Sequence, residues 1–472
     1  MWIKLISPLT TARPMDSIWK TRMAPPLALL ILGALTPKRH RVTVEDENVQ
    51  KINLGDNPDI VGITVKVDTA PRAFEIADSY RAKGIPVAMG GIHATACPED
   101  CITHCNSLVI GDAEEIWPQL VADAESGTLK NIYRNISRID SSRIPIPRWE
   151  LLNHGRYLFT NTLTIGKGCP WRCDFCYNSS ENIDSGYRTK SISQILAEIE
   201  SRKTDHVMFI DDNFIGDPNF VRRLLPEFKK LGITWHTAVS ANIGLYDDIL
   251  DMMAESGCKS LFIGFESVNQ KNLLHCHKTQ NKIERYDETI EKIHKRGMLV
   301  NASLVFGFDG DDSSVFSSTL EWLVKNRGST MTSHILTPYP GTELYRRLES
   351  EHRIIDRNLR HYNTAHAVFT PMNISPADLE SGYVKIYSDF YSWANILRRM
   401  PLADSQIMAY LQFNLLYGKF GRQTSMLGRI FGMRRLAEFA RLVSYPRWKM
   451  FKGHGKCCLM ADDTGDLVKS LT

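Results

Sequence analysis

The sequence predicts an α/β protein with three parts: a doubly wound parallel sheet at the amino end, a partial (β/α)6 barrel, and a helical carboxyl-terminal region. Short apolar runs alternate with amphipathic stretches over residues 1–135 and again over 159–350, and the alternation then stops. A segment interrupted by proline and small polar residues, 136–158, separates the two regions and is typical of a linker.

Strands and helices alternate in the amino-terminal region in an order that favours parallel pairing. The predicted strands are 3–6, 41–45, 60–65, 86–91 and 107–111, and the predicted helices are 26–35 and 70–83. Because consecutive parallel strands need crossover helices, this order places helices on the faces of one sheet. The prediction is a doubly wound domain over 1–135.

The alternation of strands and helices resumes in the second region, 159–350, where six strands are predicted. They are 163–166, 206–210, 235–239, 260–265, 299–306 and 332–336. Six strand–helix repeats are fewer than the eight of a closed barrel, so a partial (β/α)6 barrel fits the count. The active sites of such barrels lie at the carboxyl ends of the strands.

The carboxyl-terminal region, 351–472, loses the strand pattern and is aromatic and basic from 409 to 456. We favour a solvated helical region that caps the barrel and shapes the substrate pocket. The alternative is a peripheral membrane contact, through which a hydrophobic or lipid-like substrate is taken up.

The composition is that of an ordinary globular protein. Lys and Arg number 57 and Asp and Glu 53, so the net charge of +4 argues against a nucleic-acid binder. No run reaches the ~18 apolar residues that span a bilayer. Ten cysteines in 472 residues, with no clear secretion signal, indicate a reducing compartment where thiols are metal ligands or core residues. We expect a cytoplasmic protein.

Three cysteines are the strongest chemical signal in the chain. Cys169, Cys173 and Cys176 lie in one loop directly after the first predicted barrel strand. Three thiolates on a short loop can hold three corners of a [4Fe–4S] cluster and leave the fourth iron open. Zinc is the rival, but a closed zinc site needs a fourth ligand, and no His or Cys occurs among the next 29 residues, 177–205.

The cysteine motif, with the aromatic Phe175 before its last cysteine, resembles that of the radical S-adenosylmethionine (radical SAM) superfamily. Other segments resemble, in the expected order, the cobalamin-binding-domain branch, which includes magnesium-protoporphyrin monomethyl ester cyclases and many C-methyltransferases. These segments are 25–30, 90–95, 187–191, 209–214, 264–267, 307–312 and 336–342. The resemblance covers about residues 1–375.

The resemblance implies that the open iron chelates S-adenosylmethionine (SAM) beside Phe175, and that an electron from the reduced cluster yields a 5′-deoxyadenosyl radical. Asp211, Asp212 and Asn213 end the second barrel strand, where related enzymes contact the methionine amino group. Asp and Asn also favour turns, which is the alternative interpretation of this segment.

The same resemblance places the rest of SAM at later strand ends. Glu266 and Ser267 would bind the ribose hydroxyls, and Pro338 would shape the adenine pocket; simple turn chemistry is the alternative for Pro338. Gly307 and Gly310 would let the backbone approach the adenosine, or would only form a strand-to-helix turn.

The first domain is expected to bind cobalamin, on the resemblance. Thr64, Gly90 and Gly91 follow apolar strands and could contact its nucleotide tail. No Asp-x-His-x-x-Gly motif occurs in the first 135 residues, so a histidine ligand from that motif is not expected. His93 is the nearest other ligand, and we favour a hydrogen-bonded structural role for it.

A second set of cysteines, Cys97, Cys101 and Cys105, recurs at every fourth residue. On a helix this spacing places the three thiols along one face. An auxiliary cluster is one interpretation, and a core-facing stripe is the one we favour, because cysteine is among the most frequently buried residue types.

The function that these expectations favour is cobalamin-dependent methyl transfer to a carbon or phosphorus centre of a small-molecule or lipid-like substrate, with an external electron donor of the flavodoxin or ferredoxin type. A radical cyclase or rearrangement enzyme acting on a porphyrin-like substrate is the second hypothesis. A non-catalytic metal or corrinoid carrier is the third, from a different class.

Overall fold

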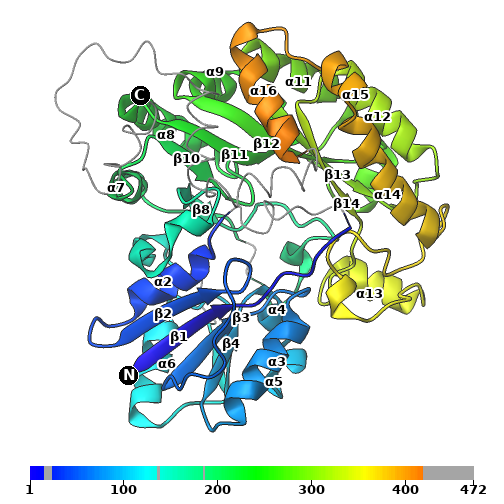
Figure 1. Cartoon of the computed structure of the whole chain (residues 1–472). Coiled ribbons are helices and arrows are strands. Elements are labelled where there is room, and N and C mark those ends of the chain that lie inside the picture. Colours follow the sequence, from blue (N-terminus) through cyan, green and yellow to red (C-terminus); the bar gives the residue numbers. More distant parts are fainter. Residues whose placement is uncertain (15–23, 136–138, 184–185, 418–472) are drawn as a thin grey trace, which may run out of the picture.

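The computed structural model describes residues 1–14, 24–135, 139–183 and 186–417. Two sheets stand one above the other in Figure 1, the blue and cyan amino-terminal sheet below and the green and yellow sheet above. The basic and aromatic segment 409–456 lies mostly outside the described residues.

The amino-terminal sheet is parallel and has six strands in the order β2-β1-β3-β4-β5-β6. Their bounds are β1 Trp2–Ser7, β2 Arg41–Asp46, β3 Ile60–Thr64, β4 Val87–Gly90, β5 Ser107–Ile110 and β6 Ile132–Arg134. The direction of winding reverses at β1, so the doubly wound prediction is confirmed. The sequence pattern missed β6, because its three residues alternate in exposure and form no apolar run.

Helices cover both faces of this sheet. The helices are α2 Leu27–Leu35, α3 Ala70–Arg81, α4 Ile92–Ala96, α5 Pro98–Ile102 and α6 Trp117–Ser126. Buried residues of α2 and α6 share one core with side chains of β1, whereas α3, α4 and α5 pack in a second core with β3 and β4. Because each face of the sheet packs against one of these cores, the strands are buried on both faces and their sequences are nearly continuously apolar.

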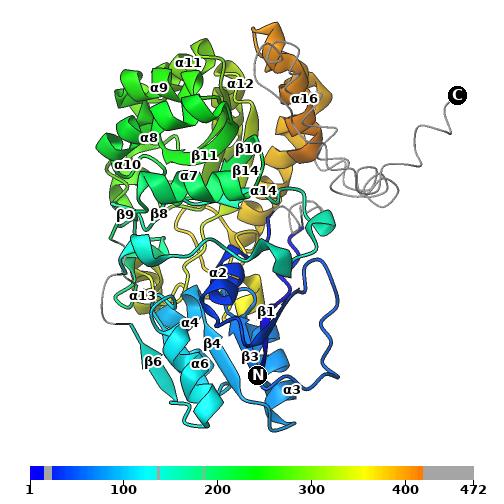
Figure 2. The ribbon, with the colours of Figure 1, turned by 90° about the vertical axis from the view of Figure 1, so that its left-hand side faces the viewer.

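The upper sheet is the predicted partial barrel. Six parallel strands follow the order β14-β13-β12-β11-β10-β7, and among the described residues β7 and β14 do not pair, so the barrel is open. The strands are β7 Thr162–Leu163, β10 His206–Phe209, β11 Thr234–Ser240, β12 Cys258–Glu266, β13 Leu299–Phe306 and β14 Thr330–Ile335. Figure 2 shows the connecting helices along the outside: α7 Ile192–Ser201, α8 Pro218–Leu231, α9 Asp247–Glu255, α10 Gln270–His275, α11 Tyr286–Lys295 and α12 Val315–Lys325.

The open edge at β14 is covered by a carboxyl-terminal helix, α14 (Pro376–Phe390). The Tyr387 hydroxyl accepts from the Ser333 N–H at 3.0 Å, and the Tyr391 hydroxyl accepts from the Met331 N–H at 3.0 Å and donates to the Met331 carbonyl at 2.7 Å. Two phenols thus satisfy backbone groups that an exposed edge strand would offer to another chain.

The carboxyl-terminal region is helical, as predicted. Besides α14 it contains α13 Glu343–Ser350, α15 Trp393–Arg398 and α16 Asp404–Tyr417. In the described part of the chain no helix has the length and apolarity that crossing a bilayer requires.

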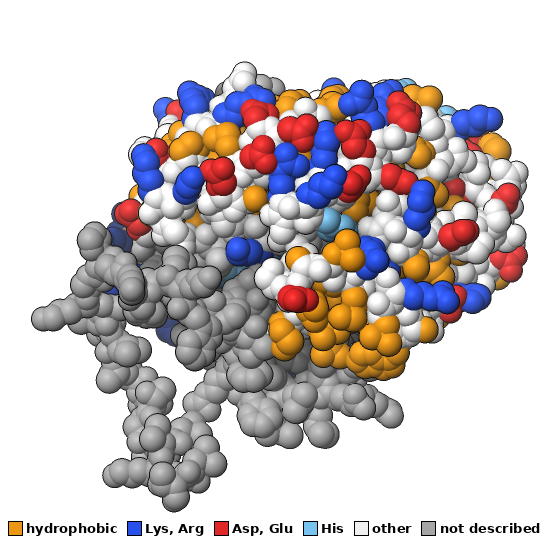
Figure 3. Space-filling model, turned by 90° about the horizontal axis from the view of Figure 1, so that it is seen from above, with side chains coloured by type: hydrophobic (Ala, Val, Ile, Leu, Met, Phe, Trp, Pro, Cys, Tyr) orange, Lys and Arg blue, Asp and Glu red, His pale blue; other side chains and the backbone are white. Residues whose placement is uncertain are grey.

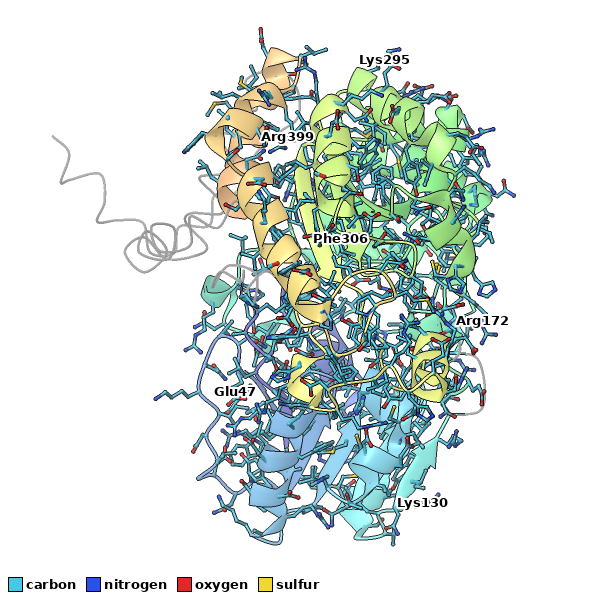
Figure 4. All side chains as sticks on the ribbon, turned by 90° about the vertical axis from the view of Figure 1, so that its right-hand side faces the viewer. Glu47, Lys130, Arg172, Lys295, Phe306 and Arg399 are labelled. Carbon is cyan, nitrogen blue, oxygen red and sulfur yellow. The ribbon has the colours of Figure 1, made fainter. Side chains whose placement is uncertain are left out.

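The carboxyl edges of the two sheets face each other. In Figure 4, Phe306 at the end of β13 lies toward the junction of the sheets, whereas Lys295 at the end of α11 lies far from it. In the lower sheet, Thr64 and Gly90 at the ends of β3 and β4 line a cavity together with Lys167 of the upper part. Ligands of both sheets would therefore meet in one region.

Candidate active site

The three-cysteine loop is closed at its base by a short antiparallel pair. β8 (Gly166–Lys167) pairs with β9 (Arg188–Thr189), and a β-carbon at Gly166 would overlap the Arg188 carbonyl. The predicted strand 163–166 is therefore corrected: the chain leaves the barrel sheet after β7 and enters this hairpin, because Gly166 pairs with Thr189 instead of with β10.

Backbone hydrogen bonds give the loop its shape. The Cys176 N–H donates to the Cys173 carbonyl at 2.9 Å, and the Ser179 hydroxyl donates to the Asp174 carbonyl at 3.0 Å. The Leu344 N–H at the start of α13 donates to the same carbonyl at 3.0 Å. Contacts within the chain therefore hold the loop in place.

The arrangement of the thiols fits a cluster better than a single ion. Cys169, Cys173 and Cys176 are all free. Burial raises the pKa of Cys169 and of Cys176, and the charge of Cys173 adds to the effect in both, so the three thiols lie in one region. Zinc–sulfur bonds of about 2.3 Å hold tetrahedral ligands about 3.8 Å apart. Among the described residues, however, these sulfurs do not all lie within 4.8 Å of one another. That wider spacing suits the corners of a four-iron cube.

Three residues were predicted to contact SAM after β10. Asp211 and Asn213 form structural hydrogen bonds, whereas the carboxylate of Asp212 is free of such bonds among the described residues. Asp211 accepts from the N–H groups of Ile165 at 3.0 Å and Gly166 at 2.9 Å, and burial raises its pKa to about 7. The Asn213 side-chain oxygen accepts from a backbone N–H of β11 at 3.2 Å. Asp212 is exposed, and its charge adds to the effect of burial in raising the pKa of the Cys176 thiol to about 12. Asp212 is thus the member of the three whose charge acts on the cysteine thiols.

A buried ion pair lies at the end of β12. Glu266 has a left-handed backbone, with φ 64°, and its carboxylate accepts from the Lys278 ammonium at 2.7 Å, with both side chains about nine-tenths buried. Burial lowers the pKa of Lys278, but the charges of Glu266 and Cys173 outweigh it and raise the pKa overall. Removing one partner of such a pair costs about 3–5 kcal/mol. The hydroxyl of Ser267 accepts from the Asn269 N–H at 3.0 Å and shapes the following turn.

The glycine-containing turn after β13 is tied by a buried acid that the sequence analysis did not single out. Gly307 has φ 103°, and its N–H donates to Asp311 at 2.9 Å. The Gly310 N–H donates to Asn272 at 3.1 Å, and Asn272 in turn donates to Asp311 at 2.6 Å. Burial raises the pKa of Asp311 to about 6. This network fixes the turn at which the resemblance to radical SAM enzymes places the adenosine of SAM.

Two further predicted residues pack around this turn. Phe175 of the loop meets Phe308 edge to face, with ring centroids 6.2 Å apart, and so belongs to an apolar cluster beneath the loop. Pro338 is buried after β14. Asp309 forms ion pairs with Arg347 at 2.9 Å and Arg353 at 2.5 Å, which anchor the turn to α13 and the segment after it.

A cavity of about 470 Å³ lies at the carboxyl edge of the amino-terminal sheet. Thr64, Gly90 and Gly91 all line it, as the resemblance requires of cobalamin-contacting residues. His93 does not line it; this side chain is fully buried and its Nε2 lies 3.0 Å from an Asp100 oxygen. The structural role favoured for His93 therefore agrees with its contacts. The other side of the cavity includes Lys167, beside the cysteine loop.

Ion pairs join the two sheets at this cavity. Lys167 of β8 pairs with Glu114 and, at 3.3 Å, with Asp112, and Arg188 of β9 also pairs with Asp112. The base of the cysteine loop is therefore held against the loop that follows β5. No sequence motif marked these residues, because the contact joins positions more than fifty residues apart.

A second cavity, of about 380 Å³, lies inside the open barrel. Polar side chains of several strands line it among apolar ones, including Asp211, His236 and Asn301, and Phe413 of α16 lies on its border. The His236 Nδ1 lies 2.6 Å from the Ser260 hydroxyl. This lining suits a largely apolar molecule that carries a few hydrogen-bonding groups.

The expected single-face stripe of Cys97, Cys101 and Cys105 is corrected in one respect. All three are buried, and Cys101 and Cys105 belong to an apolar core, as favoured. They do not share one helix, because α4 ends at Ala96 and α5 starts at Pro98. Proline disfavours helical backbone in the residue before it, so the chain turns at Cys97.

Comparisons with known proteins agree with this geometry. A family model described as the radical SAM superfamily matches residues 163–323, and one described as a domain of unknown function (DUF4070) matches 342–412. The chain is 28% identical over 387 residues to the bacteriochlorophyllide d C-12(1)-methyltransferase of Chlorobaculum tepidum, over 79% of this chain and 84% of that protein. It is 28% identical over 359 residues to the hopanoid C-2 methylase of Rhodopseudomonas palustris, over 72% and 67%.

A solved structure shares the fold. The cobalamin-dependent S-adenosylmethionine radical enzyme OxsB, solved with aqua-cobalamin and S-adenosylmethionine bound, matches with a TM-score of 0.65 at 15% identity. The match covers 94% of this chain and 78% of that one. At 15% identity this match shows only that the two proteins share a fold. The matched part of this chain includes both sheets.

Proposed function

Because this chain is a member of the radical SAM superfamily, we propose that it is a cobalamin-dependent methyltransferase acting on an unactivated carbon or on phosphorus. The observation that carries this proposal is the cavity between the two sheets. Gly90 and Gly91 of the lower sheet and Lys167 beside the cysteine loop line the same space. A corrinoid in that cavity would therefore lie next to the cluster site.

Cys169, Cys173 and Cys176 would hold the cluster, and Asp212 is the carboxylate best placed for the SAM amino group. When bound, the cluster would supply the electron for cleavage of SAM to methionine and a 5′-deoxyadenosyl radical, the species that would take a hydrogen atom from the substrate. The chain itself orients SAM: the turn built by Gly307 and Asp311 offers backbone to the adenosine.

The cavity between the two sheets suits a corrin with amide side chains. Its walls combine apolar side chains of α2, such as Leu27, with the bare backbone of Gly90 and Gly111 and with polar groups such as Asn135. Bound methylcobalamin would supply the methyl group. No histidine lies among the described residues that line the cavity, so we propose that the protein binds the corrinoid without a histidine ligand to cobalt.

The barrel cavity is our candidate substrate pocket. The two methyltransferase relatives are named for a bacteriochlorophyllide and a hopanoid, which are large molecules with extended apolar skeletons. The hydrogen-bonding pair of His236 and Ser260 would hold a polar group of such a substrate. We place the reaction in the cytoplasm, where thiols stay reduced and can act as cluster ligands.

The test is product analysis of the anaerobically reconstituted protein with SAM, hydroxocobalamin and a flavodoxin or chemical reductant. We expect both S-adenosylhomocysteine and 5′-deoxyadenosine, in about equal amounts once a substrate is methylated. Bacteriochlorophyllide d and a hopanoid are the first substrates to add. 5′-Deoxyadenosine without S-adenosylhomocysteine would favour a radical cyclase instead. If neither product formed, only the hypothesis of a non-catalytic metal or corrinoid carrier would remain.

We further propose that the carboxyl-terminal region contacts a membrane, from which a lipid-like substrate is taken. Large apolar side chains are exposed on and between α15 and α16, with Trp393 55%, Leu397 61% and Leu402 83% exposed. Figure 3 shows hydrophobic side chains gathered at the lower edge of the molecule in that view. The sequence that follows is rich in Lys and Arg, which attract anionic lipids.

Vesicle sedimentation tests the membrane contact. The protein should sediment with vesicles of anionic phospholipid at low salt, and much less with neutral ones, because charge attraction supplies part of the binding. Leu402→Asp should lower the bound fraction without unfolding an exposed site. Equal binding of the variant and the original protein, or no binding at low salt, would contradict the proposal.

A further inference from the structure

We propose that His93, Cys97 and Asp100 form a second metal site, for zinc, at the corner between α4 and α5. One potential ligand atom from each of the three residues lies within 4.8 Å of the other two. In the part of the chain that the structure describes, this is the only such group of three. It lies outside the cysteine loop and outside the cavity assigned to cobalamin.

The local backbone brings these residues together. α4 ends at Ala96, and the Cys97 N–H donates to the His93 carbonyl at 2.8 Å, so one helical turn separates the two side chains. Pro98 then starts α5, which turns the chain and returns Asp100 toward His93. The His93 Nε2 and an Asp100 oxygen are 3.0 Å apart. Two ligands with bonds of about 2.0–2.1 Å on a tetrahedral zinc are about 3.3 Å apart, so a small shift suffices.

The donor set points to zinc rather than to magnesium or calcium. Imidazole nitrogen, thiolate sulfur and one carboxylate are ligands of borderline cations, whereas calcium and magnesium prefer oxygen alone. His93 is fully buried and Cys97 is 3% exposed, while the Asp100 side chain is 38% exposed, so a water molecule would complete the four ligands of the zinc ion on that side. Ligation requires the Cys97 thiolate, so binding releases one proton.

The ring nitrogen of His93 that would bind the metal is Nε2. It lies 3.0 Å from an Asp100 oxygen, whereas Nδ1 is inaccessible and has no hydrogen-bond partner, so Nδ1 is not the ligand atom. A second His–Asp pair nearby, His104 with Asp78 at 2.9 Å, serves as an internal comparison because no cysteine joins it. The added buried thiol is what distinguishes the proposed site from an ordinary structural pair.

The position of the site suggests a role in holding the two sheets together. Gly341 packs on the corner, where a β-carbon would lie 3.0 Å from the Ala96 carbonyl. Tyr339, two residues earlier, stacks on Tyr177 of the cysteine loop with centroids 5.0 Å apart. A metal at the corner would stiffen the surface on which this segment rests. The proposal therefore concerns structure and does not depend on methyl transfer.

The experiment uses the full chain with its iron–sulfur cluster reconstituted. After incubation with micromolar zinc sulfate and desalting, metal analysis should find about one zinc per chain beside the iron. Zinc-edge X-ray absorption should show one sulfur at about 2.3 Å and nitrogen or oxygen at about 2.0–2.1 Å. Zinc bound instead in the cysteine loop would show three sulfurs, and that result would overturn the proposal.

Variants make the test specific. Cys97→Ser and Asp100→Asn should each weaken zinc binding by about 100-fold or more, with iron content unchanged. Asp100→Asn keeps a hydrogen-bonding group beside His93 at an exposed position, so this variant should fold. Cys101→Ser is the matched control, because Cys101 is also buried but is not in the group of three. Equal zinc binding by the Asp100→Asn variant and the original protein, or no zinc uptake at all, would refute the site.

Discussion

Cys173→Ala should abolish cluster assembly and SAM cleavage together. Cys173 is 6% exposed and sits in the middle of the thiol motif, so its loss leaves only two ligands from this loop. Two thiolates cannot hold three corners of a cube, and an incomplete cluster is lost from the site. The purified variant should be colourless, should contain little iron, and should form no detectable 5′-deoxyadenosine from SAM under reducing conditions.

A second buried cysteine provides the control for this variant. Cys258 is 2% exposed in β12 and lies outside the loop, so Cys258→Ala should cost only the free energy of a small cavity and should keep iron and SAM cleavage. If Cys173→Ala retained full iron content and cleavage, another residue would have to be the ligand. The assignment of the loop would then be wrong.

Ala28→Trp should abolish corrinoid binding while leaving the cluster intact. Ala28 is exposed on α2, and its side chain lines the cavity between the sheets. An indole at this position projects into the space proposed for the corrin without replacing a core residue. We expect corrinoid retained after desalting to fall at least tenfold, S-adenosylhomocysteine formation to stop, and iron content to stay the same.

The control is the same substitution on another helix. Ala122 is exposed on α6 and does not line the cavity, so Ala122→Trp adds equal bulk without obstruction. That variant should bind corrinoid as the original protein does. Equal loss in both variants would point to a folding defect, and normal corrinoid binding by Ala28→Trp would place the cofactor elsewhere.

The strands were predictable because their residues follow simple physical patterns. β3 is a nearly continuous apolar run bounded by turn residues, which is how a strand buried on both faces looks in a sequence. β13 was also predicted, although Asn301 and Ser303 interrupt its apolar residues. β6 carries no such run and was missed. The end of a helix at Cys97 was predictable because Pro98 follows it. The prediction of a single helix face relied instead on the spacing of the cysteines at every fourth residue.

The candidate site was only partly predictable, because spacing shows which residues are near in the chain and not what they contact. The three thiols are local and were identified. Asp211 was expected to face SAM, yet it accepts the backbone N–H groups of Ile165 and Gly166, where the chain passes from β7 into β8. Lys278, the partner of Glu266, was not identified, since a single lysine after a short helix carries no pattern until the fold buries it.

The most direct test of the central claim is iron analysis combined with electron paramagnetic resonance of the reduced protein, before and after SAM is added. Four irons and four sulfides per chain are expected for a cubane held by the three thiols. Its spectrum should change on adding SAM, because the amino and carboxylate groups bind the iron that lacks a protein ligand. Zinc in place of iron, or a four-iron spectrum that SAM leaves unchanged, would contradict the account.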